Sequence, residues 1–152
     1  ENELFRSTCV ILLVGATFAN VVPLPSKTKC QEHRERELNL TVAATIVPQC
    51  DENGDYVPLV CVEGENGAKH CGCCTKQGDI AKSPSPNVKR CECYNERYGG
   101  LNPPRDGSFV ARCEADGSYS KLQCHGSTGM CWCSHPDGKQ KTKPARAKVV
   151  CP

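Results

Sequence analysis

The sequence has few of the large apolar side chains from which an ordinary protein core is built. Aromatic residues make up 5% of its 152 residues, and it contains one Trp and one Met. A chain with so little apolar volume cannot bury one ordinary core along its whole length. Covalent cross-links must therefore replace part of the missing packing. Such cross-links would be lost in the reducing cytosol, so the composition argues against most intracellular enzyme folds.

The sequence also lacks a strong excess of charge and a long apolar run. Its formal net charge is +2, which is too small to predict nucleic acid binding. The apolar run at residues 8–19 is shorter than the ~20 residues that a transmembrane helix needs. A short apolar run that ends in small residues is typical of a secretory signal. We therefore expect a signal peptide at residues 1–19, an N-terminal segment at residues 20–29, secretion, and no membrane span.

Cysteine, by contrast, is abundant, with 14 residues, and the cysteines after the signal follow a repeated spacing. From Cys30, the intervals to the next five cysteines of the series are 19, 10, 9, 1 and 17 residues. From Cys93, the corresponding intervals are 19, 10, 6, 1 and 17 residues. Four equal intervals indicate an internal duplication. We predict two units, at residues 30–91 and 92–152, each stabilised by three disulfides whose pairing the spacing alone does not choose.

Each unit is expected to begin with a short helix. Thr28 and Gln31 have the spacing of a capping box, which predicts a helix over residues 30–40. The helix of the second unit is expected to be shorter, because Gly99-Gly100 and Pro103-Pro104 disfavour its continuation.

A β-hairpin is expected to follow each helix. Asn53-Gly54 and Asp116-Gly117 are typical of tight hairpin turns, because these residues tolerate positive φ. The turn-rich segment after the fourth cysteine of each unit is expected to have little regular structure. The predicted strands lie near residues 45–51 and 55–61 in the first unit, and near 108–114 and 118–124 in the second.

Residues 123–133, with the sequence QCHGSTGMCWC, resemble the signature of the thyroglobulin type-1 repeat. That signature is a QC pair, a short loop ending in Gly-x, and then CWCV. The six-cysteine spacing and the Tyr that follows each hairpin turn also fit. The resemblance covers residues 30–151 in two copies, and the tandem arrangement is similar to the two-repeat ctenitoxin-class proteins of spider venom. It implies a small disulfide-rich fold of two such domains, each with a short N-terminal helix, a β-hairpin and irregular cross-linked loops, and a secreted protein of the venom type.

The resemblance also implies that the cysteines pair first to second, third to fourth and fifth to sixth in each copy. Cys74 is then left over, as a free thiol that either joins another molecule or stays buried and inert. Pairing through Cys74 in place of Cys73 is an open alternative. The implied disulfides are Cys30–Cys50, Cys61–Cys71, Cys73–Cys91, Cys93–Cys113, Cys124–Cys131 and Cys133–Cys151.

Many members of this family inhibit papain-like cysteine proteases by inserting a wedge of loops into the active-site cleft, and others have no inhibitory role. In the first copy, residues 71–74 read CGCC and lack the Trp, whereas the second copy keeps Trp132 and a short loop. A disulfide that closes this loop would lower the ordering cost of binding. We therefore expect the second copy to be inhibitory, although Trp132 is also expected to pack on neighbouring disulfides. The candidate contact residues are Leu101, Asn102, Ser127, Thr128, Gly129, Met130 and Trp132.

A rival role is binding to an extracellular glycan, channel or receptor. Residues 139–148 carry five cations and no acid, namely Lys139, Lys141, Lys143, Arg146 and Lys148. Such a run is either a solvated loop or a patch for sulfated glycans or other anionic surfaces. Asn39 begins a glycosylation sequon, Asn39-Leu40-Thr41.

Neither a cofactor nor an enzyme activity is expected. The cysteine spacing is unlike that of zinc ligand pairs, and secretion favours oxidised cysteines. No sequence context supports a catalytic pair of Cys and His.

Overall fold

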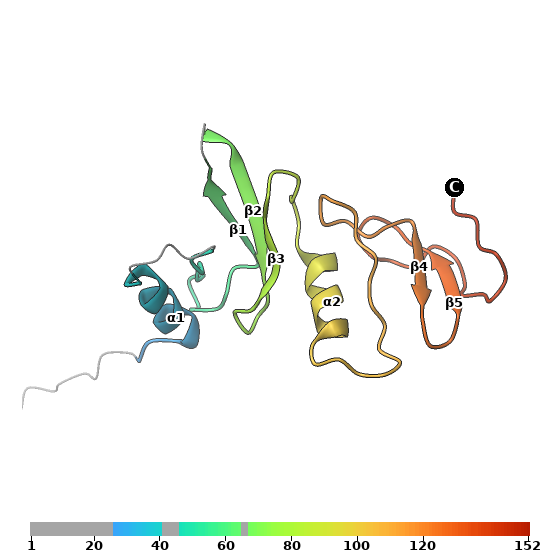
Figure 1. The fold of residues 1–152 in the computed structure, drawn as a ribbon, viewed down its shortest axis with the longest axis horizontal. Helices are drawn as coiled ribbons and strands as arrows, with labels where there is room; N and C mark the ends of the chain where they lie inside the picture. The colour runs from blue at the N-terminus through green and yellow to red at the C-terminus, as the bar shows by residue number, and fades with distance from the viewer. Residues whose placement is uncertain (1–25, 41–45, 65–66) are drawn as a thin grey trace, which may run out of the picture.

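The structure is a computed structural model that describes residues 26–40, 46–64 and 67–152, so the predicted signal peptide lies outside the described residues. Its helices and strands follow one another as α1 (Lys29–Leu38), β1 (Leu59–Glu63), β2 (Lys69–Cys74), β3 (Ile80–Ser85), α2 (Glu92–Leu101), β4 (Leu122–His125) and β5 (Met130–Cys133). Strands β1, β2 and β3 form one antiparallel sheet, and β4 and β5 form another. Figure 1 shows an elongated molecule with α1 near one end, α2 near the middle, and β4 and β5 towards the other end. No helix within the described ranges is long and apolar enough to cross a membrane.

Disulfides form much of the buried interior. The third-to-fourth cysteine links, Cys61–Cys71 and Cys124–Cys131, each join residues that lie directly opposite one another on antiparallel strands. Most of the buried apolar residues are cysteines, accompanied by a few small or β-branched side chains. Cross-links therefore stand where a larger domain would place Leu and Phe. The disulfides are Cys30–Cys50, Cys61–Cys71, Cys73–Cys91, Cys93–Cys113, Cys124–Cys131 and Cys133–Cys151, which are the pairs that the family resemblance implies.

The two halves of the chain repeat the same helix-to-loop contacts. Arg34 of α1 donates to the carbonyl oxygen of Pro48 at 2.7 Å, and Arg97 of α2 donates to that of Ala111 at 3.0 Å. Each arginine comes four residues after the first cysteine of its half. In each half, the guanidinium group thus donates to a carbonyl that lies two residues before the second cysteine of the first disulfide. The arginine and the disulfide therefore connect the same loop to the helix.

A tyrosine anchors the hairpin turn of each half in the same way. The hydroxyl of Tyr56 lies 3.0 Å from Nδ1 of His33, and that of Tyr119 donates to the carboxylate of Glu96. Burial, together with this hydrogen bond, raises the pKa of Tyr119 above its ordinary value. Each tyrosine ring packs against a glycine with positive φ, Gly78 or Gly138, where a Cβ would lie 2.5 to 3.1 Å from ring carbons.

The helices differ from the sequence expectation in length and end point. The capping box at Thr28 is confirmed, with the side chains of Thr28 and Gln31 each bonded to the backbone of the other residue. The expectation that the second helix is shorter was wrong, because α2 has ten residues, as α1 does. Gly100 is helical, and its lack of a Cβ lets the carbonyl of Phe109 approach the helix, since a Cβ there would lie 2.1 Å from that oxygen. The helix ends at Leu101, one residue before the Asn102-Pro103 pair, where proline disfavours helical geometry.

The predicted strands were largely misplaced. The turns at Gly54 and Gly117 form, but each flanking pair of segments makes a single isolated bridge, Cys50 with Tyr56 and Cys113 with Tyr119. After each bridge, the chain continues to a cross-linked hairpin, β1–β2 in the first half and β4–β5 in the second.

The segment after the fourth cysteine of the first half was also misjudged. It was expected to be irregular, but residues 80–85 form β3 and pair with β2. In the second half, the corresponding segment makes only isolated bridges.

Backbone and side-chain contacts join the two halves at the one-residue spacer between Cys91 and Cys93. The amides of Lys89 and Arg90 both donate to the carbonyl of Asp116, at 2.9 and 3.1 Å. The side-chain amide of Asn95 donates to the carbonyl of Cys74 at 3.1 Å. These hydrogen bonds connect the end of the first half with the second hairpin turn and with α2.

Candidate functional site

Two loops of the second half meet at one edge of the molecule. One begins at the last residue of α2 and comprises residues 101–109. The other comprises residues 125–130, which are the turn from β4 to β5 and the strand residue on either side of it. Figure 1 shows the end of α2, the loop after it, and the β4–β5 turn on the same side. The hydroxyl of Ser127 connects the two loops, since it donates to the carbonyl oxygen of Gly107 at 3.5 Å. Within its own loop, it lies 3.0 Å from Nδ1 of His125. We call residues 101–109 and 125–130 the loop edge.

The turn between β4 and β5 has a tightly held backbone. The amide of Gly129, which has a φ of +65°, donates to the carbonyl of His125 at 2.9 Å. The amide of Met130 donates to the hydroxyl of Thr128 at 3.3 Å. The Cys124–Cys131 disulfide joins the strands at the base of the turn. The turn therefore has few conformations to lose on binding.

An aromatic stack joins the two loops. The ring of Phe109 stacks on His125, with centroids 6.1 Å apart, and packs on Trp132 at 5.3 Å in a tilted arrangement. Trp132, for which we expected disulfide contacts, thus has Phe109 as its aromatic partner. Phe109 and His125 were missed in the sequence analysis. The scarcity of aromatic residues is the signal that would have marked Phe109 for closer inspection.

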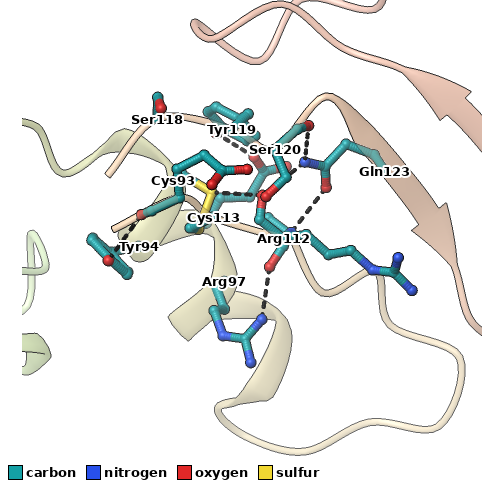
Figure 2. Close-up of a disulfide and its surroundings, with 12 residues drawn as sticks. Cys93, Tyr94, Arg97, Arg112, Cys113, Ser118, Tyr119, Ser120 and Gln123 are labelled. Carbon is teal, nitrogen blue, oxygen red and sulfur yellow. Dashed lines mark hydrogen bonds between the residues drawn. A yellow bond between two sulfur atoms is a disulfide. The ribbon is translucent and has the colours of Figure 1, made fainter. Parts of the chain in front are cut away.

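Gln123 connects β4 with the loop that precedes the second hairpin turn. Its side chain is 1% exposed and makes three hydrogen bonds to the backbone. Its amide nitrogen donates to the carbonyls of Arg112 and Ser120 at 2.7 and 2.9 Å, and its amide oxygen accepts from the N–H of Arg112 at 2.9 Å. Figure 2 shows this network beside the Cys93–Cys113 disulfide. The glutamine of the QC pair is therefore a structural residue, which holds the loop in register with the β4–β5 hairpin.

The predicted contact residues differ in exposure. Leu101 is 45% exposed, and Asn102, Ser127, Thr128 and Gly129 are also exposed. Met130 and Trp132 are half-buried. The structure thus brings the 127–130 turn against the 105–109 loop through Ser127 and Phe109, and leaves Leu101 at the end of α2.

The first half builds a different interior at the position of Gln123. Val60, the counterpart of Gln123, is 1% exposed and packs with Ile46 and Cys74. Cys74 is free and 2% exposed, and burial raises the pKa of its thiol. In Figure 1, the far ends of β1 and β2 point to the opposite side of the view from the turn between β4 and β5.

The remaining sequence candidates are not among residues 101–109 and 125–130. The Asn39 side chain is exposed at the C-cap of α1, and Thr41 of its sequon lies outside the described residues. Within the described part of the chain, no group of three or more His, Cys, Asp or Glu side chains is placed to hold a metal ion. The cations of residues 139–148 are all exposed.

Comparisons with known proteins agree with the geometry of the second half. The thyroglobulin type-1 repeat family matches residues 92–151. The chain is 40% identical to U20-hexatoxin-Hi1a of Hadronyche infensa, across 93% of this chain and 97% of that toxin. It is 33% identical to U24-ctenitoxin-Pn1a of Phoneutria nigriventer, across 77% and 89% of the two chains. It is 32% identical to mouse Nidogen-2, across 70% of this chain and 9% of that protein.

Proposed function

Since the chain belongs to the thyroglobulin type-1 repeat family, we propose that it is a secreted inhibitor of papain-like cysteine proteases with two such repeats, residues 30–91 and 92–152. The loop edge of the second repeat enters the active-site cleft of the protease. The first repeat holds the second one in place and is not the inhibitory unit.

The observation that carries this proposal is the joining of two exposed loops into one cross-linked edge. Ser127 and Phe109 tie the loop after α2 to the β4–β5 turn, and the disulfide at the base closes the turn. An edge that is ordered before binding keeps more of its contact energy as affinity. Such an inhibitor needs no catalytic group, because it excludes substrate by occupancy.

The same disulfide explains how the turn resists its target. Hydrolysis of a peptide bond within residues 125–130 leaves both new ends attached through Cys124–Cys131. The cleaved ends therefore stay close together, and the cleaved inhibitor leaves the protease cleft slowly. This retention favours continued occupancy of the cleft over release of two fragments.

A second candidate is a toxin component that acts on another extracellular target, such as a channel or receptor. Its support is the similarity to two proteins named as toxins, each covered over most of its length. The two functions differ in a direct assay, because only the first requires loss of protease activity.

The test is a titration of papain and of a cathepsin L-type protease with the oxidised protein, with residual activity as the readout. Met130→Asp places a charge beside the turn, and we expect it to weaken inhibition at least ~30-fold, as for a central contact residue. The matched control is His70→Asp, which changes the residue before Cys71 on the other hairpin and should leave inhibition unchanged. Absence of inhibition by the fully oxidised protein, or equal losses in the two variants, would refute the proposal.

A further inference from the structure

Residues 139–148 form an exposed cationic segment at the end of the second half, and we call it the cationic ridge. Its five cations, Lys139, Lys141, Lys143, Arg146 and Lys148, are all solvent-exposed. One ion pair is formed among them, between Lys139 and Asp137 at 3.1 Å, and the other four cations have no ion-pair partner among the described residues. A concentration of unpaired positive charge produces a local positive potential, although the whole chain carries only +2.

The backbone of the ridge is held rigidly even though its side chains are free. The amides of Ala145 and Cys131 donate to one another's carbonyls, at 2.8 and 2.9 Å, and the amide of Lys141 donates to the carbonyl of Cys133 at 2.7 Å. The hydroxyl of Thr142 accepts from the amide of Cys133 at 2.9 Å. The ridge therefore lies along the edge of β5 that faces away from β4. The Cys133–Cys151 disulfide links the two ends of the chain segment that contains the ridge.

Charge is unequally divided between the two halves, which adds to the effect of the ridge. Residues 30–91 carry seven basic and nine acidic side chains, a balance of 7 − 9 = −2. Residues 92–152 carry nine basic and six acidic side chains, a balance of 9 − 6 = +3. A polyanion is therefore attracted to the end of the molecule that bears the ridge and repelled by the other.

The amino-acid composition of the ridge indicates which class of polyanion it would bind. Apart from its cations, it contains only Gln140, Thr142, Pro144, Ala145 and Ala147, with no aromatic or large apolar residue. Insertion into a membrane surface needs large apolar side chains, and binding of single-stranded nucleic acid relies on aromatic stacking. Sulfate groups on a flexible polysaccharide need only charge and hydrogen-bond donors, which lysine and arginine supply.

We propose that the cationic ridge binds a sulfated glycosaminoglycan-type polysaccharide. This surface is distinct from the loop edge, because β5 pairs with β4 on one side and with the ridge on the other. The binding is independent of protease inhibition, and each activity is lost or kept without the other.

The test measures binding of a heparin oligosaccharide to the oxidised full chain by calorimetry at several NaCl concentrations. Lys139→Gln, Lys141→Gln and Lys143→Gln are combined in one variant. The control combines Lys69→Gln, Lys76→Gln and Lys89→Gln, which removes three exposed lysines from the first half and changes the net charge equally. We expect the ridge variant to weaken affinity by ~10- to 100-fold and to reduce the slope of log K against log salt by ~2 to 3. The control variant should change both quantities far less.

Three outcomes would overturn the proposal. The first is no binding of the heparin oligosaccharide, and the second is equal weakening by the two triple variants, which would indicate an effect of net charge alone. The third is affinity for fully desulfated heparin, phosphatidylserine vesicles or a DNA oligonucleotide that equals the affinity for heparin. Inhibition titrations on the same variants separate this result from the proposed function, since neither triple substitution touches the loop edge.

Discussion

Removal of the Gln123 side chain tests the structural account of the second half most directly. Gln123→Ala deletes three hydrogen bonds to backbone groups of Arg112 and Ser120. At about 0.5–1.5 kcal/mol for each bond, and with buried partners left unsatisfied, the free energy of unfolding should fall by about 2–4 kcal/mol. Gln123→Val, which copies Val60 of the first half, refills part of the volume but restores none of these bonds. It should therefore recover only part of the loss.

The assay is guanidinium denaturation with the disulfides intact, followed by the fluorescence of Trp132. Trp132 is the one Trp of the chain and lies opposite Gln123 in the β4–β5 ladder, so its signal reports on the second half. The midpoint should fall with little change in the denaturant slope. Gln140→Ala, an exposed glutamine of the same half, is the control and should change the free energy by less than about 0.5 kcal/mol.

Two results would refute the reasoning. A loss below about 1 kcal/mol in Gln123→Ala would mean that the hydrogen bonds contribute little net stability. A Gln123→Val protein as stable as the parent would mean that volume, and not hydrogen bonding, is what the position requires.

The remaining predictions concern a helix cap, a tyrosine and a thiol. Thr28→Ala removes the capping box and a 2.7 Å bond to the carbonyl of Gly54, and should lower the free energy of unfolding by about 1–2 kcal/mol in denaturation followed by circular dichroism, whereas Thr28→Ser should lower it less. Burial and the bond to Glu96 raise the pKa of Tyr119 above 10.0. The unfolded chain therefore ionises first, and the stabilising contribution of Tyr119 is present below pH ~10 and is lost as the pH rises beyond it. Tyr119→Phe should make stability less dependent on pH in that range, and an unchanged pH profile would contradict this. In a Cys9→Ser background, the buried Cys74 thiol should react with Ellman's reagent much more slowly in the native protein than after denaturation, and rapid native reaction would show that it is accessible.

Local signals in the sequence were reliable where one short segment determines the structure. The capping box at Thr28 depends only on Thr28 and on Gln31 three residues later, and it is present. The turns at Gly54 and Gly117 need only a residue that tolerates positive φ, and both turns form. The position of the strands was wrong because pairing depends on where the chain goes after the turn. The packing of Tyr56 against Gly78 contributes to that path, and these residues are far apart in the sequence.

In the candidate site, too, the features that depend on one short segment followed from the sequence, and the contacts between distant segments did not. The signature around Trp132 marked the β4–β5 hairpin, and residues 127–129 of its short loop are exposed. The contact of Ser127 with Gly107 and the stack of Phe109 between His125 and Trp132 did not follow, because they join segments about 20 residues apart through side-chain geometry. The length of α2 was misjudged for a related reason, since Gly100 is required for the close approach of Phe109 and does not end the helix.

By itself, the sequence determined the repeated cysteine spacing, the helix start and the turns, because each depends on spacing or on the conformational preferences of neighbouring residues. Only the tertiary structure decided which loops meet, that Gln123 is a buried hydrogen-bonding residue, and that the cationic ridge is bonded along β5. These features arise from contacts between distant segments, whose energies are realised only when the disulfides and the packed tyrosines have placed the segments side by side.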